Sequence, residues 1–240
     1  MLQNTRKSHI PHGSNYGGTV TASLKFDRHD RVDLWLVLQY ASILELSNSV
    51  CRLISVGEPA GSRSLARMVI ELYVDFVNLS NDDGYAGFLD VNTLMEWQKT
   101  FALAKDGNPY FAPLCDAPGF EDEVAEEAER LSGLRGEGFK KLQVKERFER
   151  ADMADDYAGL YHWLCSDTHS SLRGLAMRHI KHEDGDFSIH ILKDSTPDQE
   201  LPVVSLLLKT MANSSEIIHE RFGGGKADVE DVVARVQALE

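Results

Sequence analysis

The sequence has few cysteines, and they are far apart. Cys51, Cys115 and Cys165 are an odd number without any Cys-x-x-Cys spacing. A disulfide framework and a structural zinc site are therefore not expected, and the reducing cytoplasm is the simpler location. We predict neither a cofactor nor a metal ion.

Long apolar runs are also missing. The longest stretches, 34–38 and 203–208, fall far short of the roughly 20 residues that cross a bilayer. The beginning of the chain lacks the apolar core of a signal peptide. We therefore expect a cytoplasmic protein that makes no membrane contact.

Positive charge is scarce. The 240 residues contain 25 Lys and Arg against 38 Asp and Glu, which gives a formal net charge of −13. This balance makes a broad nucleic-acid surface unlikely, although it is compatible with a small basic pocket. A small anionic ligand or a protein is the partner that we expect, and the oligomeric state is not predicted.

The apolar residues of the sequence recur mostly with helical periodicity. Residues 1–23 are rich in Gly, Ser, Thr and Asn and indicate a flexible arm, and residues 24–240 indicate a single helical domain. We predict an all-α fold, an irregular bundle of about seven helices, with at most one short hairpin near 187–192. The expected helices cover about 27–56, 62–79, 92–105, 121–131, 144–153, 155–181 and 201–222, with a short one at 227–239. Gly133, Gly136 and Gly138 indicate a connection between two of them.

Several suggestive motifs are incomplete. The sequence GGGK at 223–226 lacks both the first glycine and the Ser or Thr of a phosphate loop. Glu216 and His219 form a single Glu-x-x-His pair, whereas di-iron bundles need two. A cluster near the end of one helix has metal-ligand chemistry, but a solvated helix end is the favoured interpretation and metal binding there is left open. Its members are His179, His182, Asp184 and Asp186.

The helix expected at 62–79 is the most unusual element. It is apolar nearly all round, which is typical of a buried helix. One narrow stripe is polar, because residues three or four apart share a face. The stripe contains Arg63, Arg67, Glu71, Asp75 and Asn78.

A second stretch, starting at Asp155, combines an apolar face with polar groups at its edge. Tyr161 and His169 are two turns apart and project in broadly similar directions. A histidine in such a place is more often structural than catalytic, and both interpretations stay open. Ser166 and Arg173 lie close to it in the sequence.

These two stretches carry a family resemblance. SRSLARMVIELYVDF from Ser62 and YAGLYHWLCSDTHSS from Tyr157 resemble the bacterial helical family catalogued as domain of unknown function 5677. An Arg-x-x-x-Glu helix there precedes a Tyr-x-x-x-Tyr…Ser-x-x-His helix. The resemblance spans about 34–178 and implies an α-helical cytoplasmic protein without an assigned activity. The matching positions are Arg67, Glu71, Tyr161, Ser166 and His169.

Two functions from different classes follow. The favoured one is a regulatory or interaction module, in which an internal polar network fixes the helices. The alternative is a HEPN-like, metal-independent RNase or another phosphate-ligand enzyme, in which Arg67 holds an anion and His169 moves a proton. In HEPN nucleases the arginine precedes the histidine, whereas here His169 precedes Arg173. The catalytic candidates are Arg67, Glu71, Tyr161 and His169, and the ligand-binding candidates are Arg63, Ser166 and Arg173.

Overall fold

The computed structural model describes residues 24–57, 61–168, 172–183, 185–191 and 197–224. Within them it is helical apart from a single two-stranded sheet, so the predicted all-α fold is confirmed. The expected arm at 1–23 and the expected helix at 227–239 lie outside these residues. The elements are α2 (Arg31–Ser55), α3 (Ser62–Asn81), η3 (Asp83–Tyr85), α4 (Ala86–Lys105), η4 (Ala112–Asp116), α5 (Phe120–Gly136), α6 (Val144–Arg150), α7 (Ala154–Asp156), η5 (Tyr157–Tyr161), α8 (His162–Thr168), α9 (Leu172–His179), β1 (Ile180–Glu183), β2 (Asp186–Ile189) and α10 (Pro197–Phe222).

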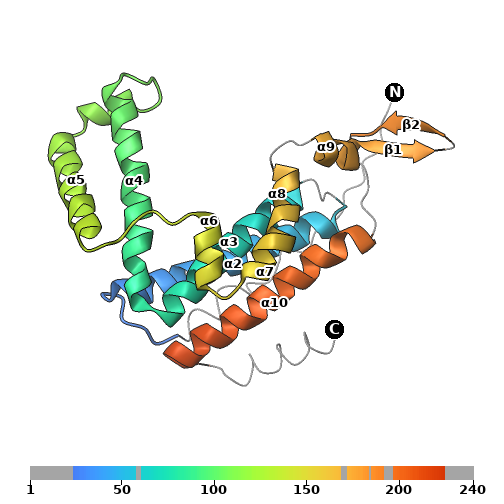
Figure 1. Ribbon diagram of the computed structural model, residues 1–240, viewed down its shortest axis with the longest axis horizontal. Coiled ribbons are helices and arrows are strands. Elements are labelled where there is room, and N and C mark those ends of the chain that lie inside the picture. Colours follow the sequence, from blue (N-terminus) through green and yellow to red (C-terminus); the bar gives the residue numbers. More distant parts are fainter. Residues whose placement is uncertain (1–23, 58–60, 169–171, 184, 192–196, 225–240) are drawn as a thin grey trace, which may run out of the picture.

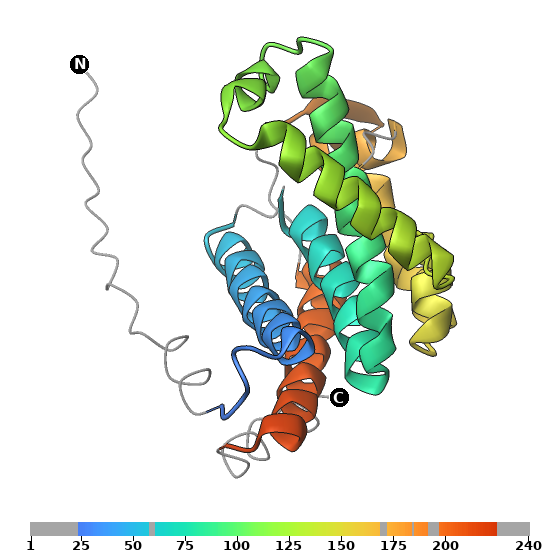
Figure 2. The same cartoon turned by 90° about the vertical axis from the view of Figure 1, so that its left-hand side faces the viewer.

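Helices α2, α3 and α10 form the core and lie side by side (Figure 2). Helix α3 is central: Val69, Ile70 and Phe76 are fully buried, as its all-round apolar pattern predicts. Polar contacts join α10 to both other helices, and Asn213 of α10 donates to the Tyr73 hydroxyl of α3 at 3.3 Å. The Tyr40 hydroxyl of α2 is 2.9 Å from that of Ser215 in α10.

Helices α4 and α5 form an arm that projects from this core (Figure 1). Buried Asp90 ties the base of the arm to the core, because it pairs with Arg31 of α2 as well as with Arg130 of α5. Gly87 is needed at the same place. A Cβ atom there would come within 2.5 Å of the Phe139 ring. An ion-pair cluster and a close aromatic contact therefore both lie at the base of the arm.

Two glycines that the sequence places in a connection between helices, Gly133 and Gly136, lie inside α5. Helix α5 continues to Gly136, five residues past the predicted end, so the connection predicted at Gly133 and Gly136 is wrong. Neither residue has a positive φ, and a glycine with helical angles lowers helix propensity without ending the helix. The turn lies at Gly138, whose φ is +97°.

The helix predicted at 155–181 is divided in the structure. A π-helical turn, η5, widens it around Gly159 and precedes α8. Helix α9 ends at His179, because Ile180 and Lys181 pair with Ile189 and Ser188 of the antiparallel partner strand. The hairpin expected near 187–192 is present, but its first strand, Ile180–Glu183, begins within the predicted helix.

No helix within the described ranges combines the length and apolar character that crossing a membrane requires.

Candidate functional site

The polar stripe of α3 contacts three other parts of the fold. Its residues recur at almost every turn of a helix whose other positions are mostly buried or half-buried, although Met68 is exposed. Each of them therefore meets a segment that packs across that one face. The partners come from α10, from α6, from η5 and from the η3 turn.

Arg67, Glu71 and Tyr161 form a closed triangle of hydrogen bonds. Arg67 Nε donates to Glu71 Oε1 at 2.9 Å, and Arg67 Nη2 donates to the Tyr161 hydroxyl at 3.0 Å. The same hydroxyl donates to Glu71 Oε1 at 2.9 Å. The guanidinium also lies 5.2 Å from the centre of the Tyr161 ring. The structure thus brings together three of the four residues that the sequence nominated as catalytic.

The electrostatics of this triangle favour one protonation state. Burial raises the pKa of Tyr161 above its usual value, and the hydrogen bond to Glu71 raises it further. Burial opposes the charged form of Arg67, but its contacts with Glu71 and Tyr161 outweigh that effect, so its pKa is also raised. Tyr161 therefore remains a neutral hydrogen-bond donor and Arg67 a cation at ordinary pH.

A second group of the same composition lies one turn further along α3. Arg147 of α6 holds Asp75 with two hydrogen bonds, Nε to Oδ1 at 2.8 Å and Nη2 to Oδ2 at 2.6 Å. The Tyr85 hydroxyl donates to Asp75 Oδ1 at 2.7 Å. Burial raises the pKa of Asp75, while Arg147 and Tyr85 act in the opposite direction. Both groups therefore contain an arginine, a carboxylate and a tyrosine.

Arg147 connects the two groups. Its Nη2 donates to the backbone carbonyl of Glu71 at 3.0 Å, and its own carbonyl accepts from Asn78 Nδ2 at 2.9 Å. We call Arg67, Glu71, Asp75 and Asn78 of α3, together with Tyr85, Arg147 and Tyr161, the α3 seam. This seam holds η3, α6 and η5 against one face of the central helix.

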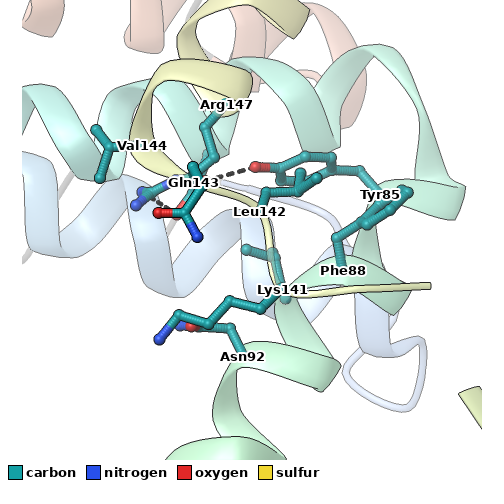
Figure 3. A pocket seen from close by; sticks show the side chains of 10 residues that line it. Tyr85, Phe88, Asn92, Lys141, Leu142, Gln143, Val144 and Arg147 are labelled. Carbon is teal, nitrogen blue, oxygen red and sulfur yellow. Dashed lines mark hydrogen bonds and ion pairs between the residues drawn. The ribbon is translucent and has the colours of Figure 1, made fainter. Parts of the chain in front are cut away.

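A pocket of about 210 Å³ opens beside the second group (Figure 3). Asp75, Tyr85 and Arg147 form part of its lining. Apolar side chains from α4 and from the chain before α6 form another part, and three polar residues complete it. The remaining lining residues are Phe88, Leu89, Asn92, Lys141, Leu142, Gln143 and Val144.

The other site candidates are spread more widely. The Arg63 guanidinium lies 4.8 Å from the centre of the Trp163 ring and 3.9 Å from Glu200 of α10. The Ser166 hydroxyl donates to the backbone carbonyl of Trp163. Arg173 is part of α9, but its side chain is outside what the structure describes, and so is all of His169.

The metal-ligand candidates do not gather in the described part of the chain. There, no group of three or more His, Cys, Asp or Glu residues could hold an ion. His179 Nδ1 contacts the backbone carbonyl of His190 at 2.9 Å, and Asp184 falls outside the description. His219 is buried, and among the described residues neither of its ring nitrogens has a hydrogen-bond partner.

Sequence reasoning missed Arg147 and Tyr85 as parts of the site. Asp75 was placed on the polar stripe, and a carboxylate on a buried helix requires a cation or several donors. That requirement was the signal in the sequence that Asp75 has partners elsewhere in the chain. It does not identify the partner, because Arg147 is 72 residues away and lies in a short helix with other charged residues.

Comparison with known proteins gives a family and no activity. No curated protein and no solved structure matches the chain. One family model, described as a family of unknown function, matches residues 33–187, which contain the whole α3 seam. The chain therefore belongs to the DUF5677 family.

Proposed function

We propose that this chain is a non-enzymatic helical module with a regulatory or protein-interaction role, in which the α3 seam is structural. The closed triangle of Arg67, Glu71 and Tyr161 carries this proposal. All three side chains direct hydrogen-bonding atoms at one another, at distances of 2.9 to 3.0 Å. A satisfied network of this kind fixes helix packing without any chemistry.

The shape of the molecule supports a contact role. The α4–α5 arm and the α9–hairpin segment extend from the core on opposite sides (Figure 1). Both carry exposed apolar side chains, and exposed groups of this type mark contacts with other proteins when they gather. They are Trp97 and Tyr110 on the first arm and Phe187, Ile189 and Ile191 on the second.

The first experiment removes only one hydroxyl. In Tyr161→Phe, Arg67 and Glu71 lose a shared partner, so we expect the free energy of unfolding to fall by about 1–3 kcal/mol in urea titrations. Tyr157→Phe is the matched control. Its ring stacks on that of Tyr161, but the described residues give its hydroxyl no hydrogen-bond partner. Unchanged stability in both Tyr161→Phe and Arg67→Ala would contradict a structural seam.

The second experiment tests the RNase alternative, which uses Arg67 and His169. Purified chain is incubated with RNA in the presence of a chelator, beside Arg67→Ala and His169→Ala. We expect no cleavage above the background that all three preparations share. Cleavage by the wild type that both substitutions abolish would overturn the non-enzymatic proposal.

A further inference from the structure

The pocket beside Asp75 and Arg147 is rich in hydrogen-bond donors. Lys141 and Asn92 extend along one side of it, and the side chains of Gln143 and Arg147 lie on the opposite side (Figure 3). An ammonium group and a guanidinium group only donate, and each amide offers two N–H bonds. The polar part of the lining is therefore suited to a ligand that accepts hydrogen bonds.

The surroundings of the pocket are positive in a protein whose formal net charge is −13. Asp75 is offset by Arg147, as described above. Glu96 Oε1 accepts from both Lys99 at 2.9 Å and Lys141 at 3.0 Å, so one carboxylate serves two ammonium groups. The Arg150 guanidinium adds a further positive charge, because it lies 4.5 Å from the ring centre of Phe88. Two further carboxylates lie beside these groups: Glu71 is 4.0 Å from Arg147, and Glu146 pairs with Lys140. The groups are then five cations and four carboxylates, and this small local excess favours an anion.

The rest of the lining is apolar. Phe88 and Leu89 come from α4, and Leu142 and Val144 come from the chain at the start of α6. The volume of about 210 Å³ is below the roughly 300 Å³ at which sites for drug-sized molecules begin. A ligand that fits both parts of the lining is small, with an apolar body and an anionic end.

We propose that this pocket binds a small organic carboxylate with an apolar body. Its carboxylate accepts hydrogen bonds from Lys141, Asn92 and Gln143, and its body packs against Phe88 and Leu142. Charge-assisted hydrogen bonds supply the specificity for the anion, and burial of the apolar body supplies affinity. The site shares Asp75, Tyr85 and Arg147 with the α3 seam, but it does not depend on the role proposed for Arg67 or Tyr161.

The test uses the full chain and phenylacetate as the probe, with binding measured by isothermal titration calorimetry. We expect a Kd of about 1 mM or tighter. Phenylacetamide has nearly the same shape without the charge, and inorganic phosphate has charge without the apolar body. Both are expected to bind at least tenfold more weakly. Binding of either one as tightly as phenylacetate would overturn the proposal.

Two adjacent lysines provide the matched variants. Lys141→Ala removes a group of the lining, whereas Lys140→Ala removes an ammonium group that pairs with Glu146 and is not part of the lining. We expect Lys141→Ala to weaken phenylacetate binding at least tenfold and Lys140→Ala to change it less than twofold. Both side chains are partly exposed, so neither substitution should unfold the chain. Absence of binding to the wild type, or equal losses in the two variants, would contradict the site.

Discussion

Arg147 of α6 holds Asp75 of α3 in a two-point ion pair, with distances of 2.8 and 2.6 Å between nitrogen and oxygen atoms. Both side chains are less than one-fifth exposed, at 19% and 14%. The pair joins residues 72 positions apart in the sequence. It therefore fixes the position of α6 on the central helix.

Removal of Arg147 is expected to be costly. Arg147→Met keeps the length of the side chain but leaves Asp75 as a buried carboxylate without its cation, so the free energy of unfolding should fall by about 3–5 kcal/mol. Lys145→Met is the control, because Lys145 forms an exposed pair with Glu149 in the same helix. Its effect should stay below about 1 kcal/mol. Urea unfolding followed by circular dichroism measures both, and equal effects would refute a dominant role for the buried pair.

Two glycines should respond oppositely to alanine. In Gly87→Ala the new Cβ meets the Phe139 ring at 2.5 Å, and this clash should destabilise the fold by about 1–3 kcal/mol. Gly133 lies inside α5 with nothing within 4 Å of the added atom. Gly133→Ala should therefore stabilise by up to about 1 kcal/mol, because alanine favours helix. Thermal unfolding of the two variants gives the signs, and a shared sign would show that the packing of the arm differs from that described.

His219 is expected to destabilise the core that surrounds it. It is 6% exposed, and among the described residues neither ring nitrogen finds a hydrogen-bond partner. His219→Leu removes these buried polar atoms and should raise the free energy of unfolding by about 1–2 kcal/mol. Glu220→Leu, at the exposed neighbouring position, is the control and should change it little. A loss of stability in His219→Leu would indicate that the imidazole has a partner of its own.

Alkaline pH should weaken the fold through Tyr161. Burial, reinforced by Glu71, raises its pKa above the ordinary value of 10.0, so the folded chain keeps a proton that the unfolded chain releases. This contribution to stability is complete below pH 10 and is lost as the pH rises further, at up to about 1.4 kcal/mol per pH unit.

The alkaline slope can be assigned with two phenylalanine variants. Unfolding free energies measured in urea at successive pH values above 10 should fall less steeply in Tyr161→Phe than in the wild type. Tyr110 is 87% exposed, so Tyr110→Phe should keep the wild-type slope. An unchanged slope in Tyr161→Phe would mean that its hydroxyl titrates alike in both states.

The local sequence pattern was sufficient to predict the central helix, but it was insufficient to predict the segments that pack on that helix. The spacing of Arg67, Glu71 and Asp75 predicts a polar stripe because i, i+4 and i+8 share a face in any helix. The π-helical turn before α8 and the end of α9 were not predictable in this way. They depend on the widened turn around Gly159 and on the pairing of Ile180 with Ile189. The periodicity of apolar residues in the sequence does not indicate either feature.

The candidate site was predictable only in part, for the same reason. Tyr161 was nominated by its place in the sequence motif, and the structure places its hydroxyl on Arg67 and Glu71. Arg147 was not nominated, because tertiary contacts alone bring α6 to Asp75. The roles suggested for His169 and Arg173 stay predictions.

The order of charges along α3 allows α6 and η5 a single alignment. Glu71 and Asp75 are separated by one helical turn, so a shift of α6 by about 5.4 Å would bring Arg147 level with Glu71 instead. That shift would leave Asp75 without its cation and would place a second arginine beside Arg67. The two carboxylates therefore favour one register of α6 on α3 during folding, because the register shifted by one turn leaves a buried charge uncompensated.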